Sequence, residues 1–341
     1  MDMSTTFLGL TLPSPIILGS GPLDQTLDLA RACEQAGAGM LIMHSLFEEQ
    51  FTAEQVADHW SMEHGSGPDP LAALAIDDAD TFILRPQEYY ERLTELKSAL
   101  RIPVAGSING ITAGNWVMYA REMEEAGADT VELNVYDPVM NGGLSSRDVE
   151  GRLLEVVKIV RHAIEIPLVV KLSPFYTSIA HLARQLDAAG VDGIAIFNRF
   201  YQPDIDVEAI EAYRTLRFST SEELPLRLRW AAALSGNIKA SIAVTGGVHT
   251  GHDVIKAILA GAHVTQVVSA IIQKGPGHLT KMLEEIDMWM TQRGETSLDG
   301  IRGRLSLQNA PDRDVYDRVN YVKLLRDQAL IPVEPSLTPH P

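Results

Sequence analysis

The feature that most constrains the fold is a short motif, Ala-Gly-(Ala/Val) followed by an apolar stretch, which the chain repeats four times. The copies begin at Ala36, Ala126, Ala189 and Ala260. A glycine just past a helix readily takes the left-handed conformation that closes the last turn, and the apolar residues after it start a buried strand. Helix-to-strand junctions that recur in this way predict parallel βα units.

Eight short apolar runs predict the strands, and helical patterns separate them. The strands are expected at 15–18, 40–43, 104–107, 130–135, 168–172, 193–197, 241–245 and 264–269. The helices are expected at 27–35, 89–100, 115–125, 153–164, 179–188, 227–234, 252–259 and 277–289. Each strand is apolar on both faces, as in a parallel sheet covered by helices. This alternation predicts an α/β fold, the (β/α)₈ TIM barrel, with a doubly wound open sheet as the alternative.

Three stretches depart from the repeat. Residues 45–86 form an insertion after the second strand, and residues 198–224 follow the sixth; in a barrel both would rise over the C-terminal face, where active sites form. We expect one barrel domain over 1–305 and a C-terminal helical extension and tail over 306–341, with an amphipathic helix at 312–327.

Charge and cysteine content exclude several classes of protein. The net charge of −17 argues against nucleic acid and anionic membrane surfaces as partners. It also means that a phosphate group must be held locally, by backbone N–H groups and one or two placed cations. Cys33 is the only cysteine, so the chain forms no internal disulfide, and the sequence has neither an 18-residue apolar run nor a signal peptide. We therefore expect a cytoplasmic protein, and no pattern of metal ligands stands out.

A glycine pair follows the seventh expected strand, in the sequence VTGGV at 244–248. Two glycines directly after a late barrel strand are typical of a loop that binds phosphate through its backbone. Gly246 and Gly247 therefore predict a phosphorylated ligand.

Polar or glycine residues end most of the other strands, at the level where a barrel binds its ligand. They are Gly19, Ser20 and Gly21 after the first strand, Ser107 and Asn109 after the third, Asn134, Lys171 and Asn198 after the fourth to sixth, and Ser269 and Ala270 after the eighth. A single asparagine at a strand end is usually a turn residue, but a set of this size indicates a ligand site.

In their order and spacing, the motifs G-S-G, S-I-N-G, E-L-N, V-K-L-S-P, N, T-G-G-V and S-A resemble the dihydroorotate dehydrogenase family of FMN-binding barrels, from about residue 6 to residue 305. The resemblance implies an FMN-dependent oxidoreductase that oxidises a CH–CH bond of a small-molecule substrate by hydride transfer to the flavin. It leaves both a homodimer and an electron-transfer partner open. The cofactor-binding residues that it implies are Gly19, Ser20, Gly21, His44, Ser45, Asn109, Asn134, Lys171, Asn198, Gly246, Gly247, Ser269 and Ala270.

The substrate side departs from the family pattern. Asp137 stands where the family has its catalytic base, a cysteine or serine; it is either the base, with a pKa raised by desolvation over the flavin, or a turn residue before Pro138. His44 replaces a lysine, Val139 an asparagine, and the substrate loop N-x-x-G-(L/F)-x-N is absent. The resemblance with these departures predicts a substrate other than dihydroorotate.

Two further interpretations remain open. One is a flavin-binding electron-transfer subunit without turnover of its own, which the altered base and missing loop favour. The other is a phosphate-binding barrel lyase that uses Lys171 as a Schiff base, which requires a desolvated lysine near a carbonyl. For Lys171 itself, the alternative to a flavin contact is a salt bridge inside the barrel.

Overall fold

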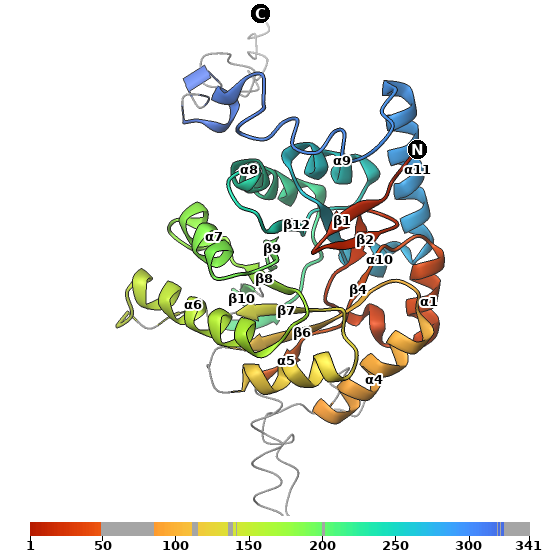
Figure 1. Ribbon diagram of the computed structural model, residues 1–341. Helices are drawn as coiled ribbons and strands as arrows, with labels where there is room; N and C mark the ends of the chain where they lie inside the picture. The colour runs from red at the N-terminus through yellow and green to blue at the C-terminus, as the bar shows by residue number, and fades with distance from the viewer. Residues whose placement is uncertain are drawn as a thin grey trace, which may run out of the picture.

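A closed barrel of eight parallel strands forms the centre of the molecule (Figure 1). The computed structural model describes residues 1–48, 85–110, 115–135, 139–140, 142–199, 202–318, 320 and 322–323. The barrel strands are β3 (Ile16–Leu18), β4 (Leu41–Ile42), β6 (Val104–Gly110), β7 (Thr130–Val135), β8 (Leu168–Leu172), β9 (Gly193–Ile196), β12 (Ser241–Thr245) and β13 (Val264–Val267). Strand β13 pairs with β3, β3 pairs with β4, and β4 pairs with β6, so the sheet closes on itself. The predicted TIM barrel is confirmed, and the open-sheet alternative is wrong.

Helices connect successive strands and surround the barrel, as Figure 1 shows. They are α1 (Leu27–Gln35), α4 (Pro86–Ala99), α5 (Trp116–Glu125), α6 (Ser146–Ala163), α7 (Ile179–Ala188), α8 (Leu224–Leu234), α9 (Gly251–Ala260) and α11 (Gly277–Arg293), together with the shorter α10 (Ser269–Lys274) and the 3-10 turns η1 (Pro22–Asp24), η2 (Ser221–Glu223) and η3 (Arg313–Tyr316). Helix α6 begins earlier than expected because Ser145 and Asp148 form a capping box, in which each side chain accepts the other's backbone N–H.

The repeated junctions behave as the sequence predicts. Their glycines, Gly37, Gly127, Gly190 and Gly261, have φ values of +104°, +93°, +88° and +118°. Each therefore occupies the left-handed region that favours glycine, and a strand follows each of them.

A hairpin that the strand pattern did not predict closes the N-terminal end of the barrel. It consists of β1 (Thr5–Phe7) and β2 (Leu10–Leu12), which pair antiparallel. Phe7 and Leu12 are buried in one apolar cluster with small barrel-interior residues such as Ala195. The alanines leave the space that the hairpin side chains fill, so the barrel has an apolar floor.

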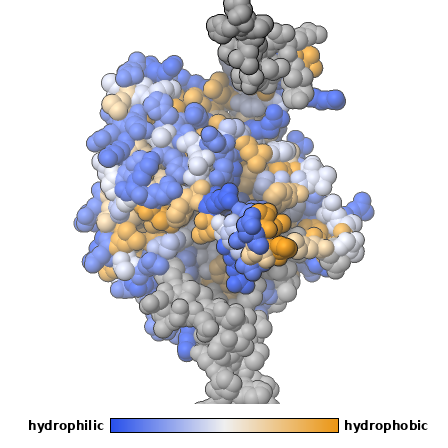
Figure 2. Space-filling model, turned by 180° about the vertical axis from the view of Figure 1, so that it is seen from behind, coloured by the Kyte–Doolittle hydropathy of each residue, from blue (hydrophilic) through white to orange (hydrophobic). Residues whose placement is uncertain are grey.

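Three more strands that the sequence pattern did not predict lie towards the C-terminal end of the barrel. Strand β5 (Leu46–Phe47) pairs with the end of β6. Strands β10 (Gln202–Asp206) and β11 (Glu211–Thr215) form a hairpin that pairs with no barrel strand. This hairpin belongs to the stretch 198–224, and it exposes apolar side chains such as Ile210. Figure 2 shows hydrophobic side chains interspersed with hydrophilic ones over the face opposite to that of Figure 1.

The expected helix at 312–327 is wrong in its first part. Only the 3-10 turn η3 forms there, and Asp317 after it is extended, with φ −90° and ψ 162°. The side chain of Asp312 accepts the N–H of Asp314 and so caps a turn that does not continue. Residues 324–341 lie outside the described residues. Across the part of the chain that the structure describes, no helix has the length and apolar character needed to cross a membrane.

Candidate active site

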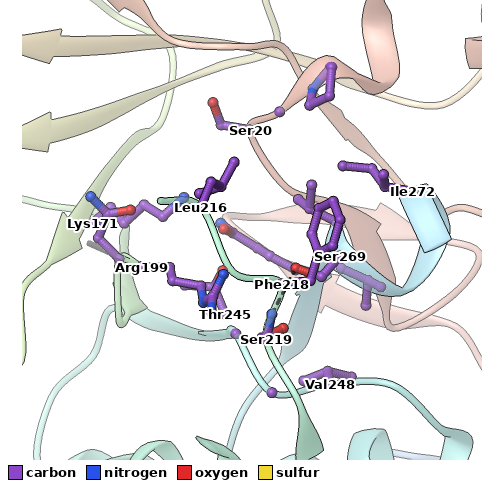
Figure 3. A pocket seen from close by; sticks show the side chains of 18 residues that line it. Ser20, Lys171, Arg199, Leu216, Phe218, Ser219, Thr245, Val248, Ser269 and Ile272 are labelled. Atoms are coloured by element: carbon purple, nitrogen blue, oxygen red, sulfur yellow. Dashed lines mark hydrogen bonds between the residues drawn. The ribbon is translucent and has the colours of Figure 1, made fainter. Parts of the chain in front are cut away.

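A cavity of about 260 Å³ opens at the C-terminal ends of the barrel strands (Figure 3). Seven of the predicted site residues line it: Ser20, Gly21, Lys171, Asn198, Gly246, Gly247 and Ser269. Gly19, His44, Ser45, Asn109, Asn134 and Ala270 lie at or near the C-terminal ends of barrel strands, the second, third and fourth among them, but do not line the cavity. In Figure 3, Lys171 and Arg199 lie on one side of the cavity, and Ser269 and Ile272 lie opposite. The structure therefore gathers residues from the first, fifth, sixth, seventh and eighth barrel strands around one hollow.

Lys171 takes part in a buried polar group inside the barrel. Its Nζ lies 3.2 Å from Oε1 of Glu132, and Nε2 of Gln266 donates to Oε2 of the same carboxylate at 2.6 Å. The side chains of Lys171 and Glu132 are 7% and 1% exposed. The salt bridge considered as an alternative for Lys171 is therefore present, and Lys171 lines the cavity as well.

Gln266 has one polar atom left over. Its Oε1 is buried and has no hydrogen-bond partner among the described residues, although Gln266 lines the cavity. A buried acceptor without a donor costs about 1–3 kcal/mol. Such an atom at a cavity wall is suited to a ligand that brings an N–H or O–H group.

Three predicted residues form a row across neighbouring strands. In the barrel register Asn109 of β6 lies beside Asn134 of β7, which lies beside Lys171 of β8. Nδ2 of Asn198 donates to Oδ1 of Asn134 at 2.9 Å. The register thus brings two amides and a lysine side chain next to one another at the C-terminal ends of three neighbouring strands.

His44 pairs with a carboxylate instead of presenting a free cation. Its Nδ1 lies 2.8 Å from Oδ2 of Asp24, whose side chain is fully buried. The same carboxylate oxygen accepts the backbone N–H of His44 at 3.2 Å, and the imidazole meets the ring of Tyr89 edge-on. Asp24 and Tyr89 are not among the predicted site residues, because only the folded chain brings them to the end of the second barrel strand.

Hydroxyl groups link the first three strand ends. The Oγ of Ser45 lies 3.1 Å from the Oγ of Ser20 and 2.8 Å from that of Ser107. Ser20 lines the cavity, whereas Ser107 is fully buried. This chain of hydroxyls connects the cavity wall to the barrel interior.

The glycine pair after β12 forms a tight turn that packs against the start of α8. Gly246 and Gly247 have φ values of +85° and +79°. A Cβ atom on Gly247 would lie 2.6 Å from the backbone nitrogen of Leu224, and one on Gly246 would lie 2.8 Å from Nη2 of Arg227. The turn thus needs glycine for both its conformation and its packing, and it borders the cavity.

Hydroxyl and imidazole groups complete the wall near this turn. The backbone N–H of Ser219 donates to Oγ of Ser269 at 3.3 Å, and Oγ of Ser219 lies 2.9 Å from Nε2 of His249. Burial lowers the pKa of His249 below its usual value, and Lys274 lowers it further. The lowered pKa favours the neutral imidazole, so His249 adds little positive charge to this wall.

The glycines after the first strand have a packing role of their own. A Cβ on Gly21 would lie 2.8 Å from Cγ1 of Val268, and one on Gly19 would lie 3.0 Å from Cγ2 of Val268. The close approach that requires these glycines is therefore to the end of the eighth barrel strand. Close approach of a flat ligand stays a prediction for Gly19 and Gly21.

Asp137, the predicted base, lies outside the described residues, as do residues 49–84 of the insertion. Cys33 is buried in the core as a helix residue, and burial raises the pKa of its thiol to about 11. Among the described residues, no group of three or more His, Cys, Asp or Glu side chains is placed to hold a metal ion.

Comparisons with known proteins agree with this geometry. The family model described as dihydroorotate dehydrogenase matches residues 77–290. The chain is 26% identical over 307 residues to the protein of Pyrococcus abyssi named dihydroorotate dehydrogenase B (NAD(+)), catalytic subunit; the alignment covers 88% of this chain and 98% of that protein. The protein of the same name from Pyrococcus furiosus is 27% identical over 307 residues, covering 89% and 98%. Dihydroorotate dehydrogenase A (fumarate) of Lactobacillus delbrueckii subsp. bulgaricus is 31% identical over 186 residues, covering 53% of this chain and 61% of that protein.

Proposed function

Because the chain belongs to the dihydroorotate dehydrogenase family, it is an oxidoreductase that acts on a CH–CH bond, and we propose that it does so with one noncovalently bound FMN. The single observation that carries the cofactor assignment is the cavity that runs from Lys171 and Asn198 to the turn at Gly246 and Gly247. One end offers polar groups suited to a flavin ring, and the other end offers a glycine turn suited to a phosphate.

The residues at both ends fit FMN. The turn at Gly246 and Gly247 borders the cavity, and the Cβ positions of both glycines face α8, so the turn backbone is available to a phosphate on the cavity side. At the other end, the unpaired Oε1 of Gln266 is an acceptor for a ligand N–H or O–H group. When bound, FMN supplies the acceptor for the hydride that leaves the substrate.

The protein's own groups then hold and orient the flavin. We assign the ammonium group of Lys171 to a flavin edge where negative charge develops, and the amides of Asn134 and Asn198 to hydrogen bonds with the ring and ribityl chain. Ser269 and Ala270, at the start of α10, are assigned to the phosphate end, and Ser20 to the face of the ring. Asp137 accepts the substrate proton in this scheme.

We further propose that the substrate is a small molecule other than dihydroorotate. The family's lysine at the end of the second strand is His44 here, and any positive charge on that imidazole is already compensated by Asp24 at 2.8 Å. A substrate carboxylate would therefore lose a fixed cation, in addition to the amide contacts of the missing substrate loop. Each unpaired buried polar group costs about 1–3 kcal/mol, so several together predict a loss of several orders of magnitude in turnover.

One structural feature opposes the lyase alternative. Nζ of Lys171 lies 3.2 Å from Oε1 of the buried carboxylate of Glu132, whereas a Schiff-base lysine needs that nitrogen free to attack a substrate carbonyl. Two relatives are named as catalytic subunits, which favours a second protein, such as an electron-transfer subunit, as a partner of this chain. A homodimer also remains a proposal for its assembly. A cytoplasmic location remains part of the proposal.

The test begins with the purified chain and mass spectrometry of the cofactor that denaturation releases. We expect FMN in a 1:1 ratio; FAD, or no flavin after reconstitution, contradicts the proposal. Anaerobic mixing follows, in which dithionite bleaches the flavin and dihydroorotate does not. Rapid bleaching by dihydroorotate would show that the substrate proposal is wrong and leave the FMN assignment standing.

The role of Asp137 has a test of its own. With a substrate identified by anaerobic screening, Asp137→Asn should slow flavin reduction by about 10²–10⁴-fold and leave FMN bound. Asp28→Asn is the matched control, because Asp28 is an exposed carboxylate in the first turn of α1. An unchanged reduction rate in Asp137→Asn would make Asp137 a turn residue.

A further inference from the structure

Two arginines share one carboxylate next to the glycine turn. Nη2 of Arg227 lies 3.8 Å from Oε2 of Glu223, and Nη2 of Arg199 lies 3.5 Å from Oε1 of the same side chain. Two guanidinium groups and one carboxylate leave one positive charge in excess. The chain as a whole has a net charge of −17, so this local excess of positive charge is opposite in sign to the overall charge.

Arg227 lies behind the turn, not in the cavity. Its side chain is 8% exposed, and it comes from α8. Nε donates to the carbonyl oxygen of Thr245 at 2.9 Å, and Nη1 donates to the carbonyl oxygen of Glu223 at 2.7 Å. Its Nη2 would lie 2.8 Å from a Cβ on Gly246, so the guanidinium group rests against the turn from the side of the helix.

Arg199 reaches the same place from the other side. It follows Asn198 at the end of the sixth barrel strand and lines the cavity, as Figure 3 shows. Its side chain is 29% exposed, and its guanidinium group keeps donors available beyond the single long contact with Glu223. The two arginines therefore flank the glycine turn, one at the wall and one beneath it.

We propose that Arg199 and Arg227 are the cations of the phosphate subsite, with Arg227 also fixing the orientation of the Gly246–Gly247 turn. This inference rests on the proposed FMN function and adds the source of countercharge for a dianionic group. Burial lowers the pKa of Arg227, while Glu223 acts in the opposite direction, and a guanidinium stays charged in proteins. Arg227 acts through the turn and is a positioning residue, whereas Arg199 is placed to contact the phosphate itself.

A purely structural role for Arg227 makes a different prediction. If Arg227 only holds β12 and α8 together, its loss lowers the affinity of every ligand of the cavity to the same extent. If it supplies charge to the phosphate, its loss weakens FMN and spares riboflavin, which has the same ring and ribityl chain without the phosphate.

The experiment titrates the full-length chain, stripped of flavin, with FMN and with riboflavin, following flavin fluorescence. Wild-type protein should prefer FMN. Arg227→Met and Arg199→Met should each lower FMN affinity by about 10–100-fold and change riboflavin affinity by less than about threefold, as expected for one charge several ångströms from the phosphate. Arg227→Lys keeps the charge and should retain more of the preference than Arg227→Met.

Arg229→Met is the matched control, because Arg229 lies on the same helix, and its Nη1 contacts the carbonyl oxygen of Tyr316 at 3.3 Å. It should leave both affinities unchanged. Thermal unfolding of each variant shows whether it folds; if Arg227→Met does not, Arg199→Met and Arg227→Lys decide the question.

Equal losses of FMN and riboflavin in the arginine variants, or unchanged FMN affinity, would overturn this inference alone. Wild-type protein that binds the two flavins equally would overturn it too, and the flavin function would stand. Wild-type protein that binds neither flavin would overturn the proposed function, and this inference with it.

Discussion

Removing the ammonium group of Lys171 should destabilise the barrel by an amount that the structure allows us to estimate. Lys171→Met leaves Glu132, 1% exposed, without its cation. Removal of one partner of a buried ion pair costs about 3–5 kcal/mol, because the other charge stays buried. Gln266 still donates to Glu132 at 2.6 Å, and a hydrogen bond to a charged group contributes about 1.5–3 kcal/mol. We therefore expect the low end of the range, about 3 kcal/mol.

A double-mutant cycle isolates the pair. The cycle compares Lys171→Met, Glu132→Gln and the double variant in urea unfolding of the flavin-free chain, with the free energy of unfolding as the measured quantity. The double variant removes both charges and keeps a hydrogen-bonding side chain for Gln266. It should therefore be less destabilised than the sum of the single variants, by about 1–3 kcal/mol.

The exposed ion pair between Arg92 and Glu95 on α4 provides the control. Its side chains are 25% and 49% exposed, and Arg92→Met should cost no more than about 1 kcal/mol. If Lys171→Met costs no more than Arg92→Met, or if the losses in the cycle add, then the carboxylate does not depend on Lys171 and our reasoning about the barrel interior is refuted.

Two further predictions concern the turn and pH. Gly246→Ala and Gly9→Ala both place a side chain at a positive φ, +85° and +78°, and each should lose at least about 1–2 kcal/mol of stability in thermal unfolding. Only Gly246→Ala should also lose FMN affinity, because its Cβ would lie 2.8 Å from Nη2 of Arg227 and displace that group from the turn, whereas a Cβ on Gly9 meets no atom within 4 Å. Equal FMN affinity in the two variants would contradict the assignment of the phosphate to this turn. Burial, with a smaller contribution from Arg302, lowers the pKa of His263 to about 4, so the unfolded chain binds a proton at this residue more readily than the folded chain does. The free energy of unfolding should therefore fall by up to about 3 kcal/mol as the pH drops from 6.5 to 4. In His263→Asn, the free energy of unfolding should change less with pH over the same window.

The barrel could be predicted from the sequence because its signals are local. A glycine after a helix and an apolar run after the glycine suffice, and the start of α6 was missed only because Ser145 and Asp148 cap it well before its apolar pattern begins. The hairpin of β10 and β11 gives no such signal. Its sequences, QPDID and EAYRT, are mostly polar, and the two strands pair only with each other.

Some residues of the candidate site could likewise be predicted from local sequence signals, whereas the contacts between them could not. Asn134 and Lys171 were found because polar residues at the ends of buried strands stand out. Glu132 lies two residues before Asn134 and so faces the same side of the strand, which the sequence alone indicates. Its pairing with Lys171 depends on how β7 and β8 lie together in the barrel, and the contact of Arg227 with the glycine turn depends on how α8 packs. Neither spacing nor composition contains that information.

The barrel can close only after its last strand has been synthesised. The joint between β3 and β13 brings together residues 250 positions apart, as in the contact of Thr265 with the carbonyl oxygen of Pro15. At 5–20 residues per second, a ribosome needs roughly 10–50 s to make the intervening chain. For that time one edge of β3 has no partner strand. Lys171 and Glu132 are likewise synthesised before strands β12 and β13, which complete the barrel around them. The nascent chain thus presents an open, apolar sheet edge until its final barrel strand emerges, which is the interval in which it is most exposed to aggregation.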